Sequence, residues 1–142
     1  MPEPLFGQHR YRLDPKGRIS LPERFREAFA DGVFLTLGQD GCLIAFPKEE
    51  WERQQARLAE LPLSDPRARA FERFFMANSA QMDLDGQGRV VIPQALRQKA
   101  GLGTEVSVNG AGRRLEIWDV AAWDRYQTAF ESQYASGTLV PE

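Results

Sequence analysis

A ten-residue pattern occurs twice in this chain and constrains its fold more than any other feature. Residues 13–22 and 84–93 both read apolar-Asp-x-x-Gly-Arg-apolar-x-apolar-Pro, with a constant offset of 71 positions, as from Asp14 to Asp85. The run Leu43–Phe46, followed by Trp51, also recurs as Leu115–Trp118, followed by Trp123, at an offset of 72 positions. Such self-similarity indicates that the chain contains two copies of one small structural unit.

Each copy of the pattern predicts a β-hairpin. We expect Pro15–Gly17 to form a three-residue loop whose last position needs the left-handed conformation that glycine adopts without strain. Asp14 then faces Arg18, and the two flanking strands pair with each other. One face of the hairpin is apolar and carries Tyr11, Leu13, Ile19 and Leu21, whereas the other carries Arg10, Arg12, Asp14, Arg18 and Ser20. In the second copy, Asp85, Gly88 and Arg89 organise the hairpin in the same way.

Hydrophobic periodicity and turn residues predict the remaining elements of the first unit. A helix from Pro22 to about Ala30 is followed by strands at residues 33–37 and 42–46, which are joined by the turn at residues 38–41. Two further helices begin at Pro47 and at Pro66, the second with Asp65 as its N-cap. These two helices have no counterpart between the copies, so we expect an insertion that clamps the two halves together.

The second unit repeats the order of the first. It contains a hairpin at residues 80–92, a helix from Pro93, strands at residues 105–108 and 115–118, and a last helix capped by Asp119. Beyond Tyr134 we expect a frayed tail.

Composition excludes several classes of protein. The 142 residues are 42% hydrophobic and 27% charged, which is typical of a soluble globular domain, and no apolar run is long enough to span a membrane. We see no secretory leader, so we expect a cytoplasmic, nucleoid-associated protein. His9 is the only histidine and Cys42 the only cysteine. The spacings of a catalytic triad, a zinc site or a phosphate-binding loop are absent, so we expect no enzyme activity, cofactor, metal or small-molecule substrate.

Positive charge is concentrated in the first copy, although the whole chain has a net charge of −2. Residues 1–26 contain six basic and three acidic side chains. Arginine can read guanine in the major groove of DNA, and lysine suits phosphate. We therefore predict that the first copy contacts double-stranded DNA and that the second is its structural partner. The predicted DNA-binding residues are Arg10, Arg12, Lys16 and Arg18.

The paired Asp-x-x-x-Arg hairpins, each followed by proline and a short helix, resemble the swapped-hairpin domain of AbrB-type DNA-binding proteins. Two such domains in a chain of this length resemble the MraZ family of transcriptional regulators. The resemblance implies an α+β fold in which duplicated swapped-hairpin units form a small β-barrel core with flanking helices. It further implies a closed ring of subunits and repression of the division and cell-wall gene cluster.

We divide the chain accordingly into residues 5–51 (first unit, DNA-reading), 52–78 (helical insertion), 79–124 (second unit, structural partner) and 125–142 (last helix and tail). An oligomer would present several hairpins at once, so we expect the target to be short direct repeats one helical turn apart in a promoter. Two alternatives stay open: an oligomeric scaffold without a role on DNA, and an AbrB-fold antitoxin.

Overall fold

The computed structural model describes residues 3–141, which form an α+β fold. The strands are β1 (Gln8–Arg12), β2 (Arg18–Ser20), β3 (Val33–Leu37), β4 (Leu43–Phe46), β5 (Ala80–Met82), β6 (Arg89–Val91), β7 (Glu105–Gly110) and β8 (Leu115–Asp119). The α-helices are α1 (Lys48–Ala59), α2 (Pro66–Ala77), α3 (Gln94–Lys99) and α4 (Val120–Ala135). Two 3₁₀ turns, η1 (Glu23–Phe25) and η2 (Glu27–Phe29), lie between β2 and β3.

The strands form one antiparallel sheet of six and a separate ladder of two. The order in the larger sheet is β1-β7-β8-β4-β3-β5, and β2 pairs with β6 in the ladder. This order keeps its pairings when each strand is exchanged for its equivalent in the other copy, because β1 then becomes β5, β3 becomes β7 and β4 becomes β8. The two copies are therefore related by an internal pseudo-twofold axis and are interlocked.

The prediction that the two strands flanking each turn pair with each other is wrong. β1 pairs with β7 rather than with β2, and β2 pairs with β6 across the two copies. Alternation along a strand decides which side chains face inward, but it does not decide which strand lies alongside. Another apolar-faced strand satisfies the same pattern. The predicted faces are nevertheless correct, since Ile19 and Leu21 are fully buried and Tyr11 and Leu13 pack against the core.

The small β-barrel core that the resemblance implied does not close among residues 3–141. β1 and β5 end the six-stranded sheet as free edges, and β2 and β6 leave it to pair with each other. The core lies between the sheet and this ladder and draws on both copies. Its fully buried members include Ile19, Val90, Leu43 and Leu115, with Phe29 from the 3₁₀ segment.

The segment after β2 forms 3₁₀ turns instead of the predicted α-helix. Its backbone bonds run from residue i to i−3, as from Phe25 N to Pro22 O (2.9 Å) and from Phe29 N to Arg26 O (3.1 Å). Phe25 and Phe29 are buried, and Ala28 is exposed. The equivalent segment α3 contains the i to i−4 bond of an α-helix, from Arg97 N to Pro93 O (3.0 Å).

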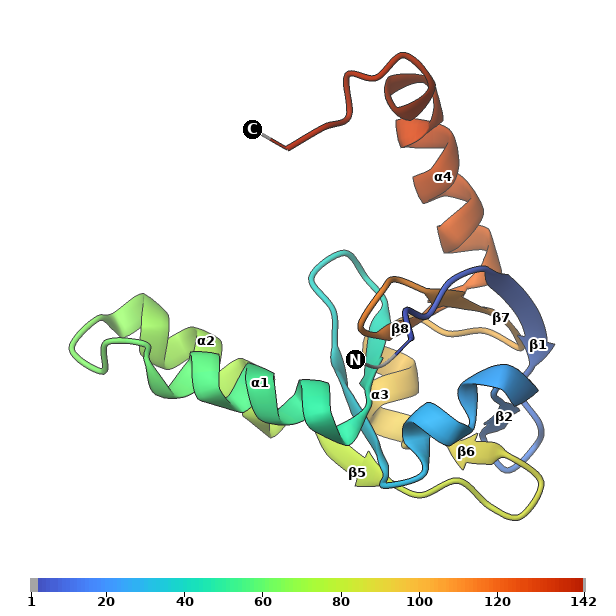
Figure 1. Cartoon of the computed structure of the whole chain (residues 1–142), viewed down its shortest axis with the longest axis horizontal. Helices are drawn as coiled ribbons and strands as arrows, with labels where there is room; N and C mark the ends of the chain where they lie inside the picture. Colours follow the sequence, from blue (N-terminus) through green and yellow to red (C-terminus); the bar gives the residue numbers. More distant parts are fainter. Residues whose placement is uncertain (1–2, 142) are drawn as a thin grey trace.

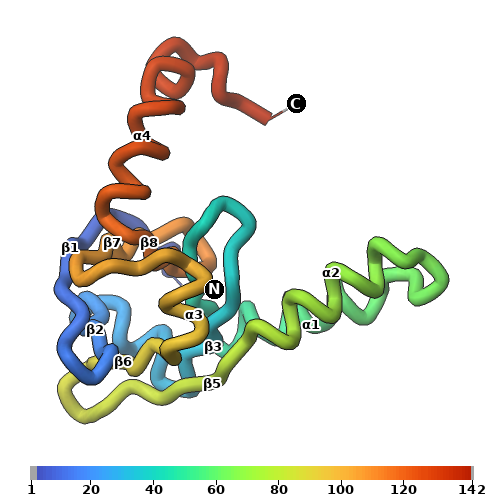
Figure 2. Tube along the Cα trace, turned by 180° about the vertical axis from the view of Figure 1, so that it is seen from behind, coloured from blue at the N-terminus to red at the C-terminus, as the bar shows by residue number. Residues whose placement is uncertain are grey.

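Two helical arms project from the sheet in different directions (Figure 1). α1 and α2 form an antiparallel pair that leaves the body beside β3 and β4, and α4 leaves it beside β7 and β8 (Figure 2). Asp65 caps α2 by accepting a hydrogen bond from Arg67 N (2.9 Å), as predicted. The paired helices do not clamp the two halves, because α2 has no fully buried residue and extends away from the body.

Candidate nucleic-acid interface

The turn between β1 and β2 is held by one carboxylate. Oδ1 of Asp14 accepts hydrogen bonds from the backbone N–H groups of Lys16 and Arg18, both at 2.9 Å. Oδ2 accepts the side-chain Nε–H of Arg18 at 2.6 Å. The backbone closes the turn through Asp14 N to Arg18 O (3.0 Å), and Gly17 takes the predicted left-handed conformation with φ of 76°. The local prediction that Asp14 faces Arg18 is therefore confirmed.

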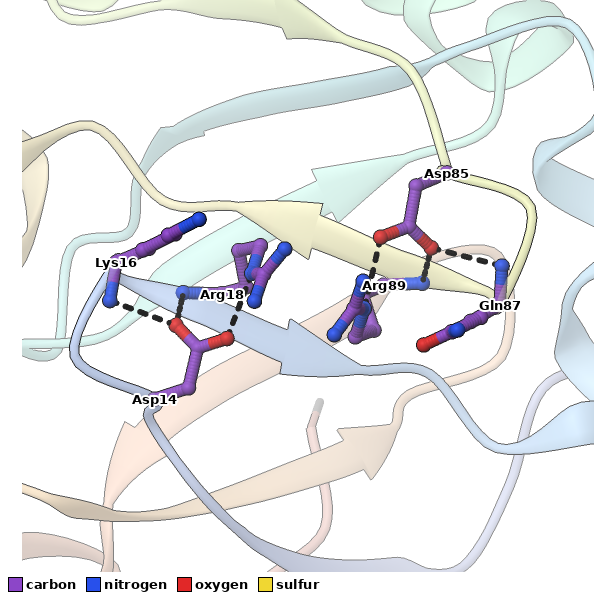
Figure 3. A network of polar contacts seen from close by, with 6 residues as sticks. All are labelled: Asp14, Lys16, Arg18, Asp85, Gln87 and Arg89. Carbon is purple, nitrogen blue, oxygen red and sulfur yellow. Dashed lines mark hydrogen bonds and ion pairs between the residues drawn. The ribbon is translucent and has the colours of Figure 1, made fainter.

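The turn between β5 and β6 repeats this arrangement closely (Figure 3). Asp85 accepts the N–H groups of Gln87 and Arg89 at 2.9 Å each and the Nε–H of Arg89 at 2.7 Å. Gly88 has a φ of 75°. Since β2 and β6 are antiparallel, the two turns lie at opposite ends of the two-stranded ladder (Figure 3).

The hydrogen bonds change the acidity of both carboxyl groups. The backbone N–H of Arg18 is the main influence that holds the pKa of Asp14 below its ordinary value of 3.8, with the Arg18 side chain adding to it. Arg89 lowers the pKa of Asp85 in the same way. Both carboxylates therefore stay ionised to lower pH than an ordinary aspartate, and both arginine side chains stay fixed.

Each turn is also bound to the opposite copy. Leu21 N donates to Gly88 O (3.0 Å), and Ile92 N donates to Gly17 O (2.8 Å). The guanidinium of Arg97 packs against Gly17, where an added Cβ would lie 2.9 Å from Arg97 Cζ.

The guanidinium of Arg26 packs in the same way against Gly88. Sequence reasoning missed both arginines. The signal was present, because Arg26 and Arg97 are 71 positions apart, the offset of the repeat.

The predicted DNA-binding residues do not share one hairpin ladder. Arg10 and Arg12 lie on β1, at the edge of the six-stranded sheet, whereas Arg18 lies on β2 and Lys16 in the turn. Arg10 bonds Asp124 at 2.8 Å, and Arg12 bonds Glu105 at 3.4 Å, each through an exposed pair. Exposed pairs of this kind are weak and can be exchanged for a phosphate. Among residues 3–141, no carboxylate lies within 4.0 Å of the Lys16 ammonium.

Within residues 3–141 no three metal-ligating side chains gather, and no helix has the length and apolar character needed to cross a bilayer. Cys42 is buried, and burial raises the pKa of its thiol to about 12, so it stays protonated and unreactive at neutral pH.

Comparison with known proteins gives one consistent result. Residues 5–74 and 75–137 each match the family described as "MraZ protein, putative antitoxin-like". A relative from Paenarthrobacter aurescens is 48% identical over 131 residues, which is 92% of each chain. Relatives from Acetivibrio thermocellus (43% identical, 86% of this chain and 85% of its own) and Deinococcus radiodurans (45% identical, 90% of each) are similar over nearly the same length. All three are named transcriptional regulators.

Proposed function

This chain belongs to the MraZ family, and from that premise we propose that it is a sequence-specific DNA-binding transcriptional repressor. Its targets would be short direct repeats upstream of the division and cell-wall gene cluster. The observation that carries the proposal is the turn at Asp14–Arg18, which combines a fixed arginine with a lysine that has no carboxylate partner among residues 3–141.

The arginine of this turn is prepared for base recognition. Asp14 holds only Nε of Arg18, at 2.6 Å, and no hydrogen bond from residues 3–141 occupies its two terminal nitrogens. These nitrogens can donate in bidentate fashion to O6 and N7 of guanine in the major groove. The ion pair fixes the side chain before binding, so less conformational entropy is lost when DNA binds. Lys16 would contact a phosphate and set the register.

The strand pairing predicted for the first hairpin would have offered a two-stranded ribbon to the major groove. A two-stranded ribbon of β1 and β2 cannot enter the groove, because those strands do not pair with each other. In the proposed mode the turn itself enters the major groove, and the β2–β6 ladder supports it on the side away from the DNA. Arg10 and Arg12 flank it on β1, where they would contact the phosphate backbone.

The first copy would be the reader, and the second would support it. Asp85 and Arg89 reproduce the geometry of the first turn, but Gln87 replaces Lys16 and Asp83 replaces Arg12. The negative charge of Asp83 at the position of Arg12 would repel a phosphate. Asp14, Gly17, Asp85, Gly88 and Arg89 thus act as organising residues, and the DNA-binding set is Arg10, Arg12, Lys16 and Arg18.

One such turn binds DNA weakly, so the proposal includes assembly into a ring. The arms expose large apolar side chains. The exposed fraction is 66% for Leu63, just before α2, 65% for Phe74 on α2, and 78% for Tyr134 on α4. Exposed apolar surface of this kind marks contacts between proteins. An α4 arm packed on the α1–α2 arm of the next copy is a head-to-tail contact, which closes into a ring when the rotation permits.

A ring explains repeated targets. Adjacent turns must meet the same side of the duplex, which requires boxes about 10–10.5 base pairs apart. Linked turns raise the effective concentration of the next contact, so affinity rises without any new kind of contact.

Light scattering tests assembly separately from binding. The wild-type chain is expected to elute as a single multiple of 16.1 kDa. Phe74→Ser is expected to give smaller species. Ala77→Ser, which changes an exposed residue of the same helix, serves as the control. A monomeric wild-type chain would contradict the ring.

The experiment that tests the function is a salt series of binding to the DNA upstream of this protein's own gene and to scrambled DNA. Preference for the upstream fragment, with log affinity falling steeply against log salt, is the expected result. Equal and weak binding to both at low salt would favour the scaffold alternative. Footprints with boxes at non-helical spacing would contradict the repeat geometry.

A further inference from the structure

Arg26 and Arg97 occupy equivalent positions but differ in their hydrogen bonds. Nε of Arg26 donates to Leu21 O at 3.2 Å. Nε of Arg97 is buried and has no hydrogen-bond partner among residues 3–141. No carboxylate in the same range lies within 4.0 Å of the Arg97 guanidinium. Arg97 is half-buried, so a counter-ion would stabilise its charge.

Arg97 lines a polar cleft of about 770 Å³ beside the first turn. The wall of the cleft includes Arg12, Leu13, Asp14, Pro15, Arg97 and Thr104. Asp14 contributes little repulsion toward an anion, because both of its oxygens already accept hydrogen bonds and Arg18 neutralises its charge. The charges in the cleft that are open to an anion are therefore the positive charges of Arg97 and Arg12. Among residues 3–141, the only carboxylate partner of Arg12 is Glu105, at 3.4 Å in an exposed pair.

We propose that Arg97 binds a backbone phosphate of DNA in this cleft, an inference that rests on the proposed function. The planar guanidinium matches a phosphate in bidentate geometry. Since Arg97 packs on Gly17, its guanidinium lies directly beside the turn that is proposed to contact DNA. The second copy, assigned above to a supporting role, then supplies one DNA contact to the reading turn of the first.

The equivalent position does not favour the same role. Around the second turn, Asp83 stands at the position of Arg12, and Gln87 at that of Lys16. Arg26 has already used its Nε on a backbone carbonyl. Arg26 therefore acts as a structural counterpart, and it provides a matched control.

The test compares Arg97→Gln with Arg26→Gln in the full-length chain, using the upstream and scrambled fragments over a salt series. Log affinity falls as log salt rises, and in Arg97→Gln this fall is expected to be less steep, by about 0.9 for each engaged turn. It is expected to weaken binding to both fragments by the same factor, because a phosphate carries no sequence information. Arg26→Gln is expected to keep the wild-type slope, while thermal melts report the structural effect of each change.

The outcomes separate this inference from the proposed function. No preference of the wild-type chain for the upstream fragment would overturn the function itself. A preference in the wild type with an unchanged slope in Arg97→Gln, or equal slope changes in both variants, would overturn only the role of Arg97.

If Arg97→Gln does not fold, Arg97→Lys decides the question. It is expected to keep the slope and to lose affinity for both fragments alike, since the charge remains but the fork is lost. Unchanged affinity would contradict the proposal.

Discussion

The two turns of this protein have almost the same geometry and different surroundings. Asp14 holds its turn with bonds of 2.9, 2.9 and 2.6 Å, and Asp85 holds the other with 2.9, 2.9 and 2.7 Å. The shared Asp-x-x-x-Arg pattern is therefore a requirement of the fold. We therefore expect the two turns to differ in function through what the copies do not share, which is mainly the charge next to the common arginine and on the strand before it.

The largest expected difference between the copies is in DNA affinity. Arg18→Ala removes the proposed bidentate contact, which is worth about 1–3 kcal/mol of discrimination at each engaged turn. Across several turns of a ring we expect a loss of about 100-fold or more in binding to the upstream fragment. Arg89→Ala is expected to change affinity by less than about threefold.

Both arginine variants remove an equivalent ion pair, so melting temperatures control for folding. Fluorescence anisotropy with labelled upstream DNA measures the affinities, and calorimetry measures the melts. Equal losses of affinity from Arg18→Ala and Arg89→Ala would show that both turns touch DNA, and the division into reader and support would be wrong.

Both turn glycines are expected to be needed for stability. Alanine in the left-handed region costs about 1–3 kcal/mol of stability. In Gly17→Ala the new Cβ would also press on Arg97, and in Gly88→Ala it would overlap the Arg26 guanidinium. Urea denaturation should show that both variants are destabilised, Gly88→Ala the more so. A stable Gly17→Ala variant would mean that the turn does not need this backbone conformation.

The sequence predicted these turns because their bonds are local. Asp14 and Arg18 are four residues apart, and the turn is specified by glycine and aspartate whatever the rest of the chain does. The N-cap at Asp65 was predictable for the same reason. Burial of Ile19 and Leu21 followed from alternation, which also depends only on neighbouring residues.

The pairing of strands was not predictable from one copy. Because both copies carry the same pattern, β2 can align its apolar face with β1 or with β6, and nothing within the pattern distinguishes the two. The choice is made by packing of the whole core, including contacts such as Leu21 N to Gly88 O. The same non-local packing places Arg97 beside Gly17, so this part of the candidate site was missed.

A charge exchange between the turns sharpens the comparison further. Lys16→Gln removes one proposed phosphate contact. Log affinity should then fall less steeply with log salt, by about 0.9 for each engaged turn. Gln87→Lys places the same charge on the second turn, where no phosphate is expected, and should leave the slope unchanged. Binding titrations at four or more salt concentrations measure both. A slope that rises in Gln87→Lys would place the second turn on DNA as well.

The smallest expected effect concerns acid stability, in which the two carboxyl groups act together. Each has a folded pKa below the ordinary value of 3.8. An aspartate of this kind contributes stability above its unfolded pKa, and the contribution is lost as the pH falls through the lower folded pKa. The free energy of unfolding should therefore decline from about pH 4 downward in part because Asp14 and Asp85 become protonated.

Asparagine isolates this contribution, because its side-chain oxygen can still accept the two backbone N–H groups of the turn while the ion pair with arginine is lost. The double variant Asp14→Asn and Asp85→Asn should be less stable than the wild type at pH 6, and the difference should shrink as the pH falls toward 2.5. Urea denaturation at a series of pH values measures it. Since each carboxyl accepts hydrogen bonds from three equivalent donors, the two single variants should lose similar amounts of unfolding free energy. A larger loss for Asp14→Asn would show that Arg12 and Lys16 act on the first turn in the free protein, before any DNA is bound.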